Sequence, residues 1–431
     1  MRTLRTPHPL RSLSVRNFRL FAAGQVVSVA GTWMMVMAQD WLVLSLTDDS
    51  GTALGAVTAL QFAPLLLLTL HGGRLADRHD KRRLLMAANV VSGTLAALLT
   101  ALVLSGAVQL WHVYLFALGL GTVNAVEVPT RMSFVSELVG PELLPNASAL
   151  SAAYFNIARV VGPALAGLLI SAAGTGPVML LNAVSYLATV LALRRMRPAE
   201  LHRTARPAER PRIVDGLRHV TGRSDLLLPM ALVGVIGLFG LNFQLTLPLL
   251  AKTVFHTDAS TFGLLTTAFA AGSLLAALAT TARRGRPSSR TVINAAFAFG
   301  LLTLASGLAP GPLTAALLLA LTGFAALYFA QAANHRVQLG SDPSYRGRVM
   351  ALYTLVLQGS TPLGALLIGR LSQEFGARSG LYAGGTVSLV AAAVAAGARR
   401  SRRGRRAGEP PPAIRGDEPP IPHERQSSHG S

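Results

Sequence analysis

Long runs of apolar residues dominate the chain, and short polar or basic stretches separate them. Most runs hold about 20 residues, which is long enough for a helix with a rise of about 1.5 Å per residue to cross a bilayer. Twelve such helices are predicted, at 18–46, 52–71, 83–105, 110–131, 146–172, 177–196, 225–250, 260–282, 291–309, 312–335, 347–372 and 379–398. The pattern therefore predicts an all-α membrane protein with twelve transmembrane helices.

A polar stretch rich in Arg and Pro, residues 197–224, divides these helices into two sets of six. We expect a basic N-terminus at 1–17, an N-terminal half at 18–196 and a C-terminal half at 225–398. Residues 399–431 are rich in Arg, Pro and Ser and lack apolar periodicity. This tail is therefore predicted to be disordered.

An internal repeat links the two halves. The stretch GPALAGLLI begins at Gly162, and the similar stretch TPLGALLIG contains Pro362, which aligns with Pro163. The alternative is coincidence, because Gly and Pro are common in membrane helices. The repeat aligns the fifth predicted helix with the eleventh, as duplication of a six-helix unit requires.

Composition and charge agree with this architecture. Hydrophobic residues make up 51% of the chain and charged residues 13%, whereas soluble domains contain about 25% charged residues. A net charge of +20 would favour nucleic acid in a soluble protein, but here the basic residues gather in alternate loops. Only Lys252 and Arg378 fall in the opposite loops, and Arg159 and Arg370 lie within predicted helices. The positive-inside rule thus predicts a cell-membrane protein with both termini in the cytoplasm and no nucleic-acid partner.

Signatures of enzymes and metal sites are missing from the sequence. A nucleotide-binding P-loop requires Gly-Lys-[Ser/Thr], and neither Lys81 nor Lys252, the only two lysines, has this context. The His residues lack an H-E-x-x-H spacing, no G-x-S-x-G motif occurs, and there is no Cys. We therefore expect no enzymatic activity, no metal site and no cofactor.

The stretch between the second and third predicted helices is GGRLADRHDKRR, from Gly72 to Arg83. The order of its residues is a more specific family marker than its positive charge. The residues that carry this specificity are Gly73, Leu75, Asp77, Arg78, Lys81 and Arg82. Their order resembles the G-x-L-a-D-r-x-G-r-R signature of the major facilitator superfamily. Asp80 replaces the second glycine, and Asp tolerates the left-handed conformation better than most residues. An ordinary basic anchor loop is the alternative interpretation. The equivalent stretch of the second half, ARRGRPSSR from Ala282, is basic but lacks the acid.

The sequence EVPTRMSFVSELV, which begins at Glu127, and the later stretches LLPNASAL and NIARVVGP resemble the enterobactin exporter-like and drug-efflux branch of this superfamily. The resemblance extends to about Arg399. It implies two six-helix halves around a midplane site and transport by alternating access. It also implies that Asp77 caps the helix that begins near Gly347, and that Arg78 or Lys81 pairs with an acid of the fourth helix.

Two further groups of gating residues follow. Glu127 is the predicted acid of the fourth helix, and Arg131 lies four residues later on the same helical face. In the fifth helix, Gly162, Pro163 and Gly167 resemble the antiporter signature, in which small residues allow close helix approach and Pro bends the helix. The Arg usually found in helix four of drug–proton antiporters has no counterpart here.

Ionisable residues inside membrane helices are costly and tend to be functional. Asp40 and Glu127 are the only acids that the predicted boundaries place well inside helices, and both are candidates for proton coupling. The alternative for Asp40 is a hydrated carboxylate at the outer interface. Arg159, halfway along the fifth helix, could shift the pKa of a carboxylate, bind an anionic group of the substrate, or form a structural pair with Glu127.

A polar stripe of the first helix and further amide and aromatic side chains could line a substrate cavity. The candidates are Gln25, Thr32, Trp33, Gln39, Tyr154, Asn242, Phe243, Gln244, Gln331 and Asn334. Each residue alone is also consistent with helix packing. Together they indicate a large, amphipathic small molecule.

The sequence therefore predicts a secondary transporter that exports an amphipathic small molecule, such as a drug, a secondary metabolite or a siderophore. Proton entry is the expected driving force, the bilayer is the expected surroundings, and a monomer is expected. An uncoupled facilitator or importer and a non-transporting membrane sensor are the alternatives. An enzyme that acts on lipid has no nucleophile–base pair to support it.

Overall fold

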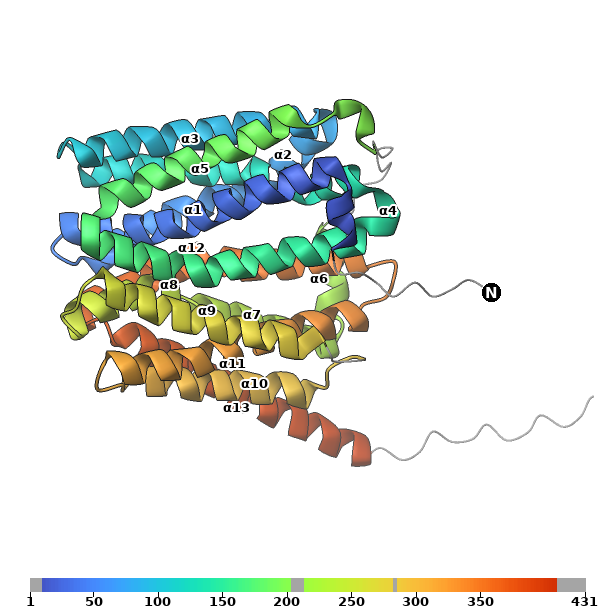
Figure 1. The fold of residues 1–431 in the computed structure, drawn as a ribbon. Helices are drawn as coiled ribbons and strands as arrows, with labels where there is room; N and C mark the ends of the chain where they lie inside the picture. Colours follow the sequence, from blue (N-terminus) through green and yellow to red (C-terminus); the bar gives the residue numbers. More distant parts are fainter. Residues whose placement is uncertain (1–9, 203–212, 282–284, 409–431) are drawn as a thin grey trace, which may run out of the picture.

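The computed structural model describes residues 10–202, 213–281 and 285–408, and every regular element among them is a helix (Figure 1). The part before the polar connection contains η1 (Arg11–Ser14), α1 (Arg16–Leu46), α2 (Gly51–Arg78), α3 (Lys81–Leu104), α4 (Leu110–Ala173) and α5 (Thr175–Arg195). The connection contains η2 (Pro198–Glu200) and α6 (Ile213–Thr221). The last part contains α7 (Ser224–Phe239), α8 (Phe243–Leu249), the π-helical turn η3 (Leu250–Val254), α9 (Ala259–Thr281), α10 (Ser289–Gly307), α11 (Pro312–Gly340), α12 (Arg346–Phe375) and α13 (Ser379–Gly408).

Eleven helical segments of the described chain are long and apolar enough to cross a membrane. One of them, α4, has 64 residues, about 96 Å of helix, and so is too long for a single crossing. Its helical geometry is interrupted at Gly140, where φ is +70°, a value that favours glycine. The chain reverses there (Figure 1), so α4 supplies two crossings, the arms 110–139 and 141–173. The twelve predicted crossings are thus present.

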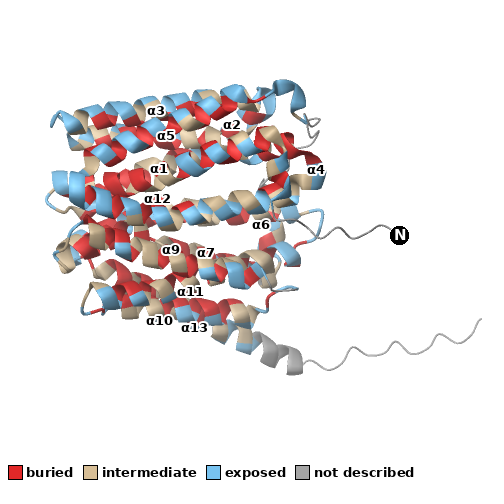
Figure 2. Ribbon diagram, in the orientation of Figure 1, coloured by how far each residue is buried: buried red, intermediate tan, exposed pale blue. Residues whose placement is uncertain are grey.

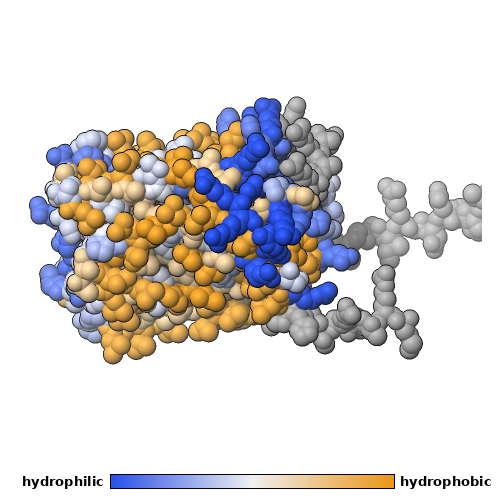
Figure 3. All heavy atoms as spheres, turned by 45° about the horizontal axis from the view of Figure 1, so that its top comes forward, coloured by the Kyte–Doolittle hydropathy of each residue, from blue (hydrophilic) through white to orange (hydrophobic). Residues whose placement is uncertain are grey.

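The long helices run along one common direction, and both η1 and the end of α13 lie at the same end of the bundle (Figure 1). We call this the terminal end and the other the far end. Buried residues lie between helices, and exposed ones follow the outer faces (Figure 2). Many exposed side chains are large and apolar, such as Leu67 and Leu98, and a hydrophobic surface covers much of the molecule in Figure 3. Strongly hydrophilic residues gather towards the terminal end (Figure 3). This arrangement suits a bundle surrounded by lipid.

The two most extensive contacts between the first six crossings and the last six are those of α2 with α12 and of the second arm of α4 with α9. A Cβ on Gly51 would lie 2.8 Å from the carbonyl oxygen of Gly369, and a Cβ on Gly167 would lie 2.7 Å from that of Ala259. Glycine therefore allows the backbones to touch at both contacts. Because these residues lie where α2 and α9 begin, the two halves are joined at the far end. Helices five and eleven, which the repeat aligns, make equivalent contacts.

Three details differ from the sequence-based expectations. The predicted loop at Gly72–Arg83 is largely helical, because α2 continues to Arg78. Asp80 is extended (φ −62°) rather than left-handed, and its side chain accepts a hydrogen bond from the backbone N–H of Arg83 at the start of α3. An acid at this helix N-cap satisfies a free backbone donor, which explains why glycine is not needed here.

The seventh predicted helix, at 225–250, is broken between Gly240 and Asn242, where α7 ends and α8 begins. The Asn242 side chain donates a hydrogen bond to the carbonyl oxygen of Leu238 (2.8 Å), which the break would otherwise leave unpaired. Glycine and asparagine are weak helix formers, and Asn competes for backbone groups.

The tail also differs from expectation, because α13 continues from the last crossing to Gly408. Six of the ten residues 399–408 are Arg, a good helix former, and the first Pro that follows is Pro410. The remainder of the predicted disordered tail, 409–431, lies outside the described residues.

Candidate functional site

A cavity of about 290 Å³ lies between the two halves. It is lined by α1, the second arm of α4, α8, α9, α11 and α12, and by Leu241 at the break between α7 and α8. We call it the central cavity. Its four aromatic lining residues, Trp33, Phe243, Phe262 and Phe269, form an apolar wall. The charged residues among its lining are Asp40 and Arg159.

Asp40 is 1% exposed, and neither oxygen of its carboxylate has a hydrogen-bond partner in the described part of the chain. The alternative of a hydrated carboxylate at the outer interface is therefore wrong. Burying an unpaired carboxylate is costly, and inside a membrane helix such residues are usually functional. The structure brings Asp40 together with Trp33, Phe243 and Gln244, which were predicted as cavity residues.

Arg159 lies across the same cavity, with its guanidinium carbon 5.7 Å from the centre of the Trp33 ring. Cations are attracted to the face of an indole ring at this distance. Among the described residues, Arg159 has no carboxylate within 4 Å. The predicted structural pair with Glu127 is therefore wrong: the Oε1 atom of Glu127 lies 3.5 Å from Nε of Arg131, its neighbour at i+4.

The superfamily signature has a different acidic partner from the one expected. Lys81 forms an ion pair with Glu137, whose side chain is 12% exposed, so the predicted pairing with Glu127 is wrong. Arg82 donates hydrogen bonds to the carbonyl oxygens of Leu193 (2.6 Å) and Arg194 (3.1 Å) at the end of α5. The signature thus fastens the start of α3 to α4 and α5.

Glu137 escaped the sequence analysis because the fourth helix was predicted to end at residue 131. The acid occurs in the sequence EVPTRMSFVSELV, ten residues after Glu127. The signal for a longer helix was the recurrence of apolar residues after residue 131, namely Met132, Phe134, Val135, Leu138 and Val139. A longer helix would have added a second acid close to the basic residues of the signature.

The remaining residues of the signature are open to solvent. Asp77 and Arg78 are exposed, Leu75 is 37% exposed, and Gly73 faces open space. No side chain caps the start of α12, where Tyr345 is the N-cap residue, so the predicted cap by Asp77 is not formed. The close glycine contacts between α2 and α12 lie at the far end, whereas Asp77 lies at the opposite end of α2.

The glycines and proline of the fifth helix lie at contacts between helices. Gly162 faces Trp33 of α1, and a Cβ there would come within 2.7 Å of the Trp33 Cβ. Pro163 lines the central cavity, and a Cβ on Gly263 would lie 2.8 Å from its carbonyl oxygen. Together with Gly167, these residues bring α4 against both α1 and α9.

Other predicted cavity residues lie elsewhere. Gln25, Thr32 and Gln39 line a second cavity of about 320 Å³ within the first half, together with Glu127 and Arg131. The four that line neither cavity are Tyr154, Asn242, Gln331 and Asn334. Tyr154 packs against an apolar cluster of the first half.

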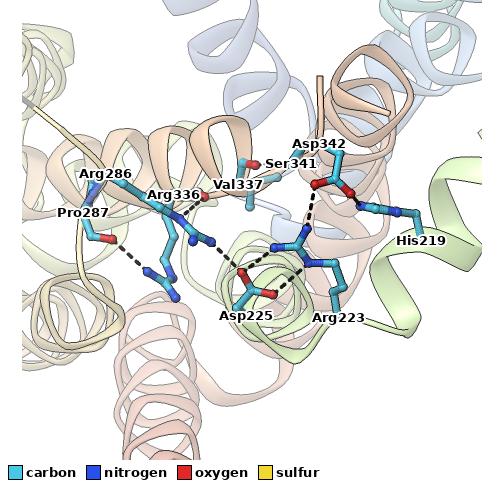
Figure 4. Close-up of polar contacts among 9 residues, drawn as sticks. All are labelled: His219, Arg223, Asp225, Arg286, Pro287, Arg336, Val337, Ser341 and Asp342. Carbon is cyan, nitrogen blue, oxygen red and sulfur yellow. Dashed lines mark hydrogen bonds and ion pairs between the residues drawn. The ribbon is translucent and has the colours of Figure 1, made fainter. Parts of the chain in front are cut away.

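A polar cluster at the terminal end of the second half replaces the missing acid of its loop. Asp225 lies between Arg223 (3.1 Å) and Arg286 (2.8 Å), and Arg223 also reaches Asp342 at 3.3 Å (Figure 4). Hydrogen bonding to Asp225 raises the pKa of Arg223. His219 of α6 stacks on Tyr345, with ring centres 4.4 Å apart. Sequence reasoning missed this cluster because its acids come from α7 and the α11–α12 turn.

The two-half bundle, its central cavity and the signature agree with a comparison against known families: the model for transmembrane secretion effectors matches residues 8–418. The chain belongs to this family, within the major facilitator superfamily. Like the transmembrane secretion effectors in general, it is built as a multi-pass membrane transporter.

Named relatives are similar in length. The chain is 29% identical over 371 residues to the multidrug efflux pump Tap of Mycolicibacterium fortuitum, covering 83% of this chain and 89% of that protein. It is 27% identical over 268 residues to the staphyloferrin A transporter of Staphylococcus aureus, covering 60% of this chain and 66% of that protein. A solved bacterial homologue of the lysosomal transporter Spinster, inward-facing and occupied, has a TM-score of 0.68 at 15% identity, with 92% of this chain and 98% of that chain covered. Its fold is thus the same.

Proposed function

We propose that the protein exports an amphipathic small molecule across the cell membrane by alternating access, in exchange for protons. The observation that carries this proposal is the buried, unpartnered Asp40 in a cavity between the two halves, opposite Arg159. The relatives support export, since Tap is named as a multidrug efflux pump. Drugs, secondary metabolites and siderophores are the classes of cargo that fit an amphipathic cavity.

The positive-inside rule supports a cytoplasmic location for the terminal end, because basic residues gather there. The far end is then external. In this orientation the molecule has its external end closed, by the glycine contacts of α2 with α12 and of α4 with α9. An ion pair between Lys252 and Asp49 (2.7 Å) lies at the same end. We infer that this conformation takes up cargo from the cytoplasm, and we propose a monomer with two six-helix halves at 18–196 and 225–398.

The aromatic wall of the central cavity would hold the apolar part of the cargo, and Gln244 offers it a hydrogen bond. Asp40 would take up a proton when the external end opens and release it when the cytoplasmic side opens. Bound cargo and bound proton would then compete for the same space. Arg159 supplies a fixed positive charge that attracts anionic groups of the cargo.

Everted membrane vesicles test the proposal. Vesicles with the protein should accumulate a transported dye or antibiotic only while a proton gradient is imposed, and Asp40→Asn should abolish this accumulation. Glu374→Gln is the matched control, because Glu374 pairs with Arg370 on the exposed surface. Accumulation that ignores the gradient in the wild type would indicate an uncoupled facilitator instead.

A further inference from the structure

The second cavity has a chemistry unlike that of the central cavity. Its volume is about 320 Å³, and α1, α2, α3, α4 and α5 of the first half supply most of its wall. Gln358 of α12 adds one residue from the second half. Uncharged polar side chains line it from four helices: Gln39, Gln61, Asn89, Ser92 and Asn124. We call it the amide chamber.

The charges of the amide chamber cancel. Its lining contains one acid, Glu127, and one strong base, Arg131, whose carboxylate and guanidinium atoms lie 3.5 Å apart. Arg131 also donates a hydrogen bond to the amide oxygen of Gln25 (3.3 Å). No other Asp, Glu, Lys or Arg is among the described residues that line this chamber. A ligand with a net charge would therefore lose its hydration without meeting an unpaired opposite charge.

Several of the chamber's amides have unused hydrogen-bonding capacity. The Oε1 atom of Gln61 is buried and has no hydrogen-bond partner among the described residues. Within the same residues, Gln39 and Asn124 make no hydrogen bond. Asn89 uses one donor on the Leu85 carbonyl oxygen of its own helix. Each amide offers two donors and an acceptor, so the wall can both give and accept hydrogen bonds.

The amide chamber adjoins the central cavity. Val36 of α1 lines both. Phe155 lines the chamber, and its ring packs edge-to-face on Trp33, which lines the central cavity, with ring centres 6.0 Å apart. A single molecule with an apolar end and a polar end could therefore contact the central cavity and the amide chamber at the same time.

We propose that the amide chamber binds an uncharged group rich in hydroxyls or amides, while the apolar body of the same molecule occupies the central cavity. This inference deepens the proposed export function, because it assigns the chemical class of the polar end of the cargo. Gln358 makes the bound group touch both halves, so its binding is sensitive to their relative position.

Binding to purified full-length protein in lipid nanodiscs tests this proposal without relying on transport. Three fluorescent probes share a naphthyl ring and differ in the polar group: a glucoside, a sulfate and a trimethylammonium. The measurement uses the Asp40→Asn, Arg159→Gln double variant, because it removes both charges of the central cavity, which could themselves attract a charged probe. This protein should bind naphthyl glucoside about tenfold more tightly than the two charged probes, since two or more net hydrogen bonds are at stake. Equal or tighter binding of either charged probe would overturn the proposal.

Variants in each cavity show which of the two cavities causes the preference for the glucoside. Gln61→Leu and Asn124→Leu should each weaken glucoside binding about fivefold and leave sulfate binding within about twofold. Gln244→Leu, in the central cavity, is the matched control and should leave the glucoside-to-sulfate ratio unchanged. Equal weakening of all probes by the chamber variants would contradict the assignment.

A charge-switch variant keeps the test informative if a leucine variant fails to fold. Asn124→Asp changes no heavy-atom count and adds a negative charge, so the preferred probe should change from the glucoside to the trimethylammonium. An unchanged order of affinities in folded Asn124→Asp would also overturn the proposal. If the preference holds but no export is found, the proposed function fails and the chamber stands. If a protein without the preference still performs gradient-driven export, the chamber assignment fails and the proposed function stands.

Discussion

Replacing Glu137 with Gln removes one partner of the ion pair that fastens the start of α3 to the first arm of α4. The side chains of Lys81 and Glu137 are only 17% and 12% exposed, so Lys81 would be left as a poorly hydrated, unpaired cation. Breaking fully buried pairs costs about 3–5 kcal/mol and breaking exposed pairs about 0–1 kcal/mol; we expect about 2 kcal/mol here. For a chain of this size, that loss lowers the melting temperature by about 2–3 °C.

Thermal unfolding of the purified protein in detergent measures this effect. Glu200→Gln is the matched control, because the Arg197–Glu200 pair is 65% and 41% exposed and its loss should shift the melting temperature by less than about 1 °C. The double variant Lys81→Met with Glu137→Gln should recover part of the loss. An unchanged melting temperature in Glu137→Gln, or strictly additive losses in the double variant, would refute the reasoning.

Three other outcomes are expected. Arg159→Gln should fold with a melting temperature close to wild type, because no acid pairs with Arg159 among the described residues, but its export of anionic cargo should fall at least about tenfold relative to neutral cargo; unchanged selectivity would contradict the role assigned to the guanidinium. Gly55→Leu should open the far end, because even a Cβ would lie 2.5 Å from a backbone carbonyl oxygen of α12. Spin labels on Ser105→Cys and Leu308→Cys, which are specific because the protein has no native Cys, should report a longer distance between the two labels in this variant. An unchanged distance would contradict the opening. Asp258→Ala should cost about 0.5–1 kcal/mol, because Asp258 accepts hydrogen bonds from the hydroxyl and backbone of Ser260 at the start of α9. Hydrogen bonding to Ser260 lowers the pKa of Asp258, so its stabilisation is complete above about pH 4 and is lost as the pH falls through the lowered pKa; equal acid sensitivity of Asp258→Ala and wild type would argue against this cap.

The crossings could be predicted from the sequence because they depend on local properties. An apolar run of sufficient length specifies a membrane helix, and basic loops distinguish one end of the bundle from the other. Helix ends were predicted less well, because α2 continues through the polar stretch 72–78 and α4 continues past residue 131. The shortened fourth helix had a chemical consequence, since it hid Glu137 and gave Lys81 the wrong partner.

Site residues could be predicted from the sequence only where they lie together on one face of a single helix. Helical periodicity places Gln25, Thr32 and Gln39 on one face of α1, and the structure has them in one cavity. The same periodicity does not say which neighbouring helices complete that cavity. Gln61 and Asn124 come from α2 and α4, and only tertiary packing brings them beside α1. For the same reason, charge counting alone paired Glu127 with Arg159, whereas the nearest base is Arg131 on its own helix.

In the proposed mechanism, proton entry through Asp40 drives export. This coupling is tested most directly with purified protein in liposomes, where an imposed pH difference is the only driving force and both cargo and pH are followed. Wild-type protein should move cargo against its gradient while protons move in the opposite direction. Asp40→Asn should bind cargo but couple neither flux to the other. Cargo movement by Asp40→Asn that still follows the pH difference would contradict the account.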